Sequence, residues 1–385
     1  MTRDGETCDH GPTGESQSPN PNDQHGVYGS LTTVLAKCHS RDRAKRWKPE
    51  FSTNRRPKED CSYVNYRREL IRKIGVSTEN DDGEPDDLDI FLTDFEDEVS
   101  SLAPSCAVEE VREFCQNPSL EDLKSGAGPA GHRRAAWLDD RTRLSLRGGG
   151  GVRTYENPLT ATGLHRLLER PRYDEPGQPD ADRRLIYIAD LDPGYILALA
   201  ETASFHQIEA LRSAIWKHLA FQTSIKARIP PKGFTIFQFE LHLPYLALRR
   251  LELGRNRPGR VRRKPARGYT DLSFLEIPPL KAQDNAKWVI QEAQFSLAIC
   301  GSDECRYVAY AFEDLDFDGE DLEERDFSYT EFHEDPIAGF GKLDANMPEE
   351  ARPYFLHVFG LRIVHLLNEW ERLVRVVELN IKRYV

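Results

Sequence analysis

The sequence predicts an α+β fold, in which a small sheet of hairpins is covered by helices and followed by a long C-terminal stalk helix. Apolar and polar residues alternate from 225 to 243 around a turn, which is typical of two paired strands. An apolar stripe at helical spacing comes directly before them, and a near-heptad pattern runs through the last part of the chain. The 385 residues are enough for two or three ordinary domains.

The N-terminal third has little material for a core. Residues 1–60 are rich in Pro, Asn, Ser and Gly and poor in large apolar side chains, which predicts a disordered tail. Residues 61–159 are expected to form a polar, acidic and Gly-rich region with short helices at 66–74 and 108–115. Because glycine leaves the backbone unrestricted, we expect residues 117–160 to be a linker with one or two short helical segments.

An ordered α+β domain is predicted over 160–345, and its first elements alternate strand and helix. The apolar run 185–189 indicates a strand, and Asp192, followed by a proline, supplies the N-cap and N1 positions of a helix. Ser204 and Gln207 form a capping box for the next helix. The apolar stripe of that helix, which should face a sheet, consists of Ile208, Leu211, Ile215 and Leu219.

Two hairpins are expected to supply the sheet. Residues 225–229 and 237–243 flank a Pro-Pro-Lys-Gly turn, and residues 295–300 and 307–312 flank Gly-Ser-Asp-Glu. Between the hairpins, residues 249–267 contain nine Arg and Lys side chains with two prolines and two glycines. That composition predicts a flexible basic loop.

Residues 346–385 are predicted to form the stalk helix, beginning near Pro353. Its apolar residues are three and four apart, close to a heptad seam. The predicted seam consists of Phe359, Ile363, Leu366, Trp370, Leu373, Val377, Ile381 and Tyr384. No glycine or proline follows Gly360, so we expect a helix whose end has been truncated.

Composition disfavours several classes of protein. The chain has 52 Lys and Arg against 64 Asp and Glu, a net charge of −12, which argues against a nucleic-acid partner. No run of eighteen residues lacks charged side chains, so we expect no membrane span. Seven cysteines without a Cys-x-x-Cys pair are typical of reduced thiols in the cytoplasm. Nucleophile elbows, phosphate-binding loops and zinc-protease motifs are absent, so we predict no enzyme and no cofactor.

One acidic segment resembles half of a calcium loop. Asp314, Asp316 and Asp318 alternate and are followed by a glycine, the arrangement with which hard cations are bound. The position that should close the shell with a glutamate is Arg325. Three interpretations stay open: a specific Ca²⁺ site, weak attraction of Mg²⁺ or Ca²⁺, and a solvated acidic loop.

A second group of polar residues lies on one face of a predicted strand. Gln238, Glu240 and His242 alternate with apolar neighbours and form a possible ligand trio. Exposure on the solvent face of a hairpin explains all three without a metal.

Three blocks resemble a filamentous-fungal family that is similar to the cytosolic part of CorA-type magnesium transporters. They are RRLIYIADLDP at 183–193, AETASFHQ at 200–207 and GFTIFQFELHLPY at 233–245. The likeness covers roughly residues 160–385. It implies an α/β cytosolic domain followed by a long stalk helix. In such proteins the stalk helix continues into membrane spans with a Gly-Met-Asn-like filter, and neither the spans nor the filter motif occurs in this sequence.

These observations lead to two hypotheses of function. The first is a soluble, membrane-less CorA-like protein that acts as a regulatory or assembly module or is a truncated transporter-like product. The second is an adaptor unrelated to ion transport. In either case the expected partner is another copy or a transporter-like protein, bound through the C-terminal helix.

Overall fold

The computed structural model places its described residues in one unit, Trp47–Val385. The described residues are 61–74, 86–92, 104–116, 119–142, 151–229, 236–252, 267–274, 286–302, 304–315, 334–338, 341–342 and 349–384. The predicted disordered tail, residues 1–60, lies outside them, as do Asp316 and Asp318.

A mixed sheet of eight strands forms the centre of the fold, in the order β2-β1-β3-β8-β7-β5-β4 with β6 added beside β7. Its strands are β1 (Ala136–Arg141), β2 (Val152–Arg153), β3 (Arg183–Ala189), β4 (Ser224–Arg228), β5 (Phe237–Glu252), β6 (Tyr269–Asp271), β7 (Ala286–Gly301) and β8 (Tyr307–Glu313). A separate pair joins β9 (Glu334–Asp335) to β10 (Gly341–Lys342). The α+β class is confirmed, but the sheet is larger than the small set of hairpins that the sequence predicts.

Both predicted strand pairs are present in the sheet. β4 pairs with β5 and β7 with β8, each antiparallel. The sequence did not indicate that β5 and β7 also pair with each other, from Phe237 opposite Gly301 to Glu252 opposite Ala286. This long ribbon joins the two hairpins into one sheet.

β3 is an inner strand of the sheet, and its seven residues are all buried. It runs parallel to β8 and antiparallel to β1. β1 lies within 117–160, so the prediction of a linker there is wrong for this segment. The same pairing carries the sheet across the predicted domain boundary at residue 160.

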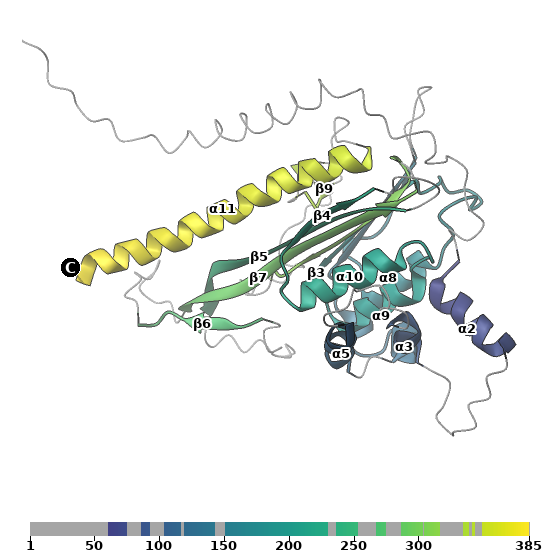
Figure 1. Cartoon of the computed structure of the whole chain (residues 1–385), viewed down its shortest axis with the longest axis horizontal. Helices are drawn as coiled ribbons and strands as arrows, with labels where there is room; N and C mark the ends of the chain where they lie inside the picture. The colour runs from purple at the N-terminus through teal and green to yellow at the C-terminus, as the bar shows by residue number, and fades with distance from the viewer. Residues whose placement is uncertain are drawn as a thin grey trace, which may run out of the picture. The chain divides into compact units, whose positions relative to one another are not determined.

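Helices cover both faces of the sheet (Figure 1). The helices before the last one are α2 (Tyr63–Ile74), α3 (Asp87–Leu92), α5 (Pro104–Phe114), α6 (Leu120–Ser125), α7 (Pro129–His132), α8 (Ala161–Leu168), α9 (Pro193–Thr202) and α10 (Ile208–Leu219). α10 packs on β5 and β7, and three of its four predicted stripe residues, Ile208, Leu211 and Ile215, are buried. The predicted cap of α9 forms, because the Asp192 carboxylate accepts a hydrogen bond from the Tyr195 amide at 3.1 Å.

The last helix, α11 (Ala351–Tyr384), lies along β5 and β7 on the other face (Figure 1). The two faces can be separated by neighbouring residues of β5. The ring of Phe239 lies 5.3 Å from that of Phe355 in α11, whereas the next residue, Glu240, pairs with Lys217 of α10. Successive strand residues point to opposite faces, so α10 and α11 sandwich the long ribbon.

Candidate functional site

An ion pair in the core attaches α11 to the sheet. Arg362 is buried, and its Nη1 donates to Glu313 Oε1 at 2.6 Å at the end of β8. Its other nitrogens donate to the carbonyls of Ile337 at 2.9 Å and Pro336 at 2.7 Å. The guanidinium also lies 3.9 Å from the centroid of the Phe295 ring. A buried cation with this many partners fixes the rotation of the helix about its axis.

Two further contacts extend this attachment along the helix. Tyr354 donates its hydroxyl to Asp335 at 2.8 Å near the start of α11. Farther along, Arg249 of β5 pairs with Glu369 at 2.9 Å, and both side chains are mostly buried. Leu373 packs with Leu248 and Leu272 beyond that point. α11 is therefore held to the sheet over several turns.

On the side of α11 that does not pack on the sheet, a stripe of apolar residues is exposed, and we call it the outer stripe. It consists of Ile363, Leu367, Trp370, Val374, Val377 and Ile381, whose exposed fractions run from 37% to 58%. The residues are spaced four, three, four, three and four apart, which is the spacing of a coiled-coil seam. This is a long apolar surface without a partner in the described part of the chain.

The structure changes the composition of the predicted seam. Ile363, Trp370, Val377 and Ile381 do belong to the outer stripe. Leu366 and Leu373 instead pack toward the sheet, and Leu367 and Val374 take their place. At about 100° per residue, Leu366 lies about 60° to one side of Ile363 around the helix axis, and Leu367 lies about 40° to the other side. The apolar residues of α11 are therefore divided between the surface that packs on the sheet and the outer stripe.

The second candidate site is a buried polar centre between α10 and the sheet. His218 and His242 each place Nδ1 beside Ser296 Oγ, at 3.0 Å and 2.9 Å. Asp314 lies 3.3 Å from Nε2 of His218 and accepts a hydrogen bond from Arg267 at 2.8 Å. All of these side chains except Arg267 are almost fully buried.

The polar centre contains Ser, His and Asp, the residue types of a catalytic triad, but its geometry indicates a structural role. Ser296 has no exposed surface, and its hydroxyl lies within hydrogen-bond distance of the Nδ1 atoms of two histidines. A nucleophile needs access for a substrate, and this hydroxyl has none. Burial, with smaller contributions from Lys217 and His218, lowers the pKa of His242 well below its usual value of 6.5. We therefore infer that His242 is neutral and that the centre holds α10 on the sheet.

The proposed ligand trio on β5 is buried, so the expectation that solvent exposure explains it is wrong. Glu240 pairs with Lys217 of α10, and Gln238 donates to Glu240 at 2.5 Å. His242 belongs to the polar centre. Nothing in the local alternation distinguishes a solvent face from a face covered by a polar helix. The missed partners, Lys217 and Ser296, lie in other elements.

Asp314, the first predicted cation ligand, is not in a solvated loop. Its carboxylate accepts from Arg267 and from the Gln294 amide at 2.9 Å, and His218 lies beside it. Burial raises the pKa of Asp314, but His218 and Arg267 together outweigh it and hold the pKa below its usual value. Across the described residues, no three His, Cys, Asp or Glu side chains are placed to hold one metal ion. A site that includes Asp316 and Asp318 stays a prediction.

Comparison with models of known protein families, with curated proteins and with solved structures gives no match for this chain. Within the part of the chain that the structure describes, no helix has both the length and the apolar content that crossing a membrane requires.

Proposed function

We propose that the chain is a non-catalytic, CorA-like assembly module that associates with a second copy of itself through the outer stripe of α11. The observation that carries the proposal is the exposed heptad spacing from Ile363 to Ile381 on a helix already fixed to its own domain. A stripe with this spacing packs best against another stripe of the same spacing, because each side chain then fits between four of the partner. A second copy supplies such a stripe.

Charges beside the outer stripe favour a second copy as the occupant. Along one border, acidic and basic residues alternate in the order Glu371, Arg375, Glu378 and Lys382. Glu378 and Lys382 already pair at 2.6 Å within the helix. Because neither sign dominates, two copies do not meet a field of one sign when they approach.

The apolar surface of the outer stripe determines how strongly two copies are expected to associate. Complete burial of a large apolar side chain stabilises by about 1.5–3 kcal/mol, so covering six half-exposed side chains contributes about 1 kcal/mol each, or about 12 kcal/mol for two copies. Association costs about 4–15 kcal/mol in lost freedom of motion. With a cost in the lower part of this range, about 5–6.5 kcal/mol, a net of about −5.5 to −7 kcal/mol remains, which corresponds to a concentration-dependent dimer with a Kd of about 10–100 μM.

Other features support the CorA-like and non-catalytic parts of the proposal. The sequence blocks at 183–193, 200–207 and 233–245 contribute β3, the connection from α9 to α10, and the first part of β5, and a long helix follows the sheet. That order of elements is the one that the resemblance implies. The closed Ser296 hydroxyl favours a structural use of the polar centre over catalysis.

Sedimentation velocity of the full chain over a range of concentrations tests the proposal. Trp370→Asp with Val377→Asp places two charges in the middle of the outer stripe and should give a monomer at every concentration. Circular dichroism at concentrations below the expected Kd should show a folded chain that still melts cooperatively, with a modest loss of stability because part of each side chain is buried.

A matched control uses Leu379→Asp with Ile225→Asp. Both residues are exposed large apolar side chains, one on another side of α11 and one on β4. This variant should sediment like the wild type. A wild-type protein that remains monomeric at ~100 μM, or a control that dissociates as the stripe variant does, would refute self-association through this surface.

A further inference from the structure

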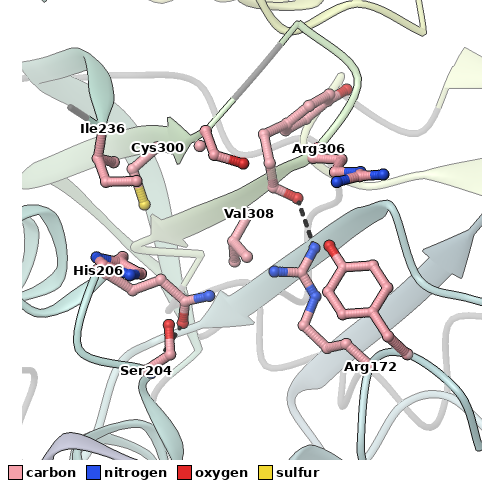
Figure 2. A pocket seen from close by; sticks show the side chains of 12 residues that line it. Arg172, Ser204, His206, Ile236, Cys300, Arg306 and Val308 are labelled. Atoms are coloured by element: carbon pink, nitrogen blue, oxygen red, sulfur yellow. Dashed lines mark hydrogen bonds between the residues drawn. The ribbon is translucent and has the colours of Figure 1, made fainter. Parts of the chain in front are cut away.

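A small pocket lies where the N-terminus of α10 meets the ends of β7 and β8 (Figure 2). The enclosed space of the pocket is about 20 Å³, enough for about one water-sized group, so a larger ligand would also occupy its open mouth. Three basic residues line it, namely Arg172, His206 and Arg306, and none of its described lining residues is acidic. The Arg306 guanidinium lies 3.5 Å from the Asp182 carboxylate, whereas Arg172 has no carboxylate partner among the described residues.

Arg172 is held rigidly at one wall of the pocket. Its Nε and Nη2 donate to the carbonyls of Ala181, Asp182 and Tyr307 at 2.8 to 3.4 Å. Figure 2 shows the other terminal nitrogen, Nη1, turned toward the middle of the pocket. Nη1 makes no hydrogen bond to any residue that the structure describes. A guanidinium fixed in this way is a preorganised donor.

Gln207 also lines the pocket. Its Oε1 accepts from the Tyr310 hydroxyl at 2.8 Å and from the Ser204 amide at 3.2 Å. With the oxygen so occupied, the Nε2 group is the free end of the amide and can only donate. Gln207 is also the N-cap of α10, whose first turn has no side-chain cap, so the positive end of the helix dipole lies beside it.

The hydroxyl groups of two buried serines add the observation that points most directly to a ligand. Ser204 and Ser302 line the pocket and are only 5% and 7% exposed. Neither Oγ has a hydrogen-bond partner among the described residues. Figure 2 shows the Ser204 hydroxyl directed into the pocket. Each Oγ atom keeps some accessible surface although its residue is buried, so both hydroxyls can hydrogen-bond to a group that enters the pocket.

We propose that this pocket binds a phosphate-type oxyanion through Arg172, Gln207, Ser204 and Ser302 at the N-terminus of α10. The donors come from several elements and surround the pocket, which suits the tetrahedral oxygens of phosphate better than the two coplanar oxygens of a carboxylate. Cys300 and Val308 form an apolar floor. Burial raises the pKa of the Cys300 thiol to about 12, so the thiol stays neutral and does not repel an anion.

The substitution Gln207→Glu tests the site with little change of shape. A glutamate keeps an oxygen for Tyr310 and Ser204 but replaces the donor with negative charge. In isothermal titration calorimetry of the full chain with sodium phosphate at constant ionic strength, the wild type should bind saturably. Gln207→Glu should bind about tenfold more weakly or worse, because a charge-assisted hydrogen bond is replaced by repulsion. Gln222→Glu, the same change at an exposed position, should bind within about twofold of wild type.

Sodium acetate in a parallel titration separates the two anion classes. Saturable binding of phosphate without acetate supports the proposal, whereas binding of acetate alone overturns the choice of phosphate. Absence of saturable phosphate binding at millimolar concentrations, or equal binding by wild type and Gln207→Glu, overturns the site itself. If Gln207→Glu does not fold, Ser204→Ala takes its place and should weaken phosphate binding several-fold while leaving the melting temperature in phosphate-free buffer unchanged.

Discussion

The Arg362 to Glu313 pair allows a quantitative prediction about how α11 is held. Arg362→Met keeps the length of the side chain but leaves Glu313 buried, and among the described residues only the Tyr187 hydroxyl then donates to its carboxylate, at 2.9 Å. Both partners are about 5% exposed, so water cannot compensate for the lost charge. Removing one member of a buried ion pair costs about 3–5 kcal/mol, and we expect a loss of unfolding free energy of this size.

Urea unfolding followed by circular dichroism measures this loss. Lys382→Met breaks an ion pair on the same helix that is mostly exposed and should cost less than about 0.5 kcal/mol. Glu313→Gln combined with Arg362→Met removes the orphaned charge and should recover about 1–2 kcal/mol of the single-variant loss. A loss below about 1 kcal/mol in Arg362→Met, or no recovery in the double variant, would show that Glu313 does not depend on Arg362 for compensation.

Two further predictions concern the polar centre and the turn between β7 and β8. The folded-state pKa of His242 is lowered, so below pH 6.5 the unfolded chain binds a proton that the folded chain excludes. Stability should therefore fall with pH below 6.5 by up to about 1.4 kcal/mol per pH unit, and His242→Gln should make that slope shallower in urea titrations at pH 5 to 7. An equal slope in both proteins would contradict a neutral His242. Gly301→Ala would place a Cβ 2.2 Å from the Arg306 carbonyl oxygen, so thermal melting should show a loss of about 1–3 kcal/mol, and an unchanged melting temperature would mean that the turn relaxes freely.

Local signals predicted the elements whose pattern is complete within a few residues. Asp192 followed by proline marks the start of α9, and alternation marks β5. β1 was not predicted because its buried positions are Ala136, Leu138 and Asp140, and Asp140 interrupts the apolar alternation. Asp140 is stable there because Arg184 donates to both its oxygens at 2.8 and 2.7 Å. That partner is distant in sequence, so no local pattern reveals it.

The candidate sites, too, could be predicted only where their residues form a pattern within a short stretch of sequence. The apolar spacing of α11 indicated an association surface, but the choice between Leu366 and Leu367 depends on which side Arg362 turns to the sheet. The donors of the anion pocket come from segments around Arg172, Ser204 and Ser302, which only the fold brings together. None of them belongs to a compact motif.

The position of β3 has a consequence for the order in which the chain can fold during synthesis. β3 is fully buried and lies between β1 and β8, and Arg183 pairs with Tyr307 far along the chain. Until the ribosome has released β8, one edge of an apolar strand has no neighbour, and such edges recruit other chains. Contacts between distant segments also form slowly. We therefore expect a nascent chain of this protein to leave one edge of β3 unpaired until β7 and β8 arrive as a hairpin and close the sheet.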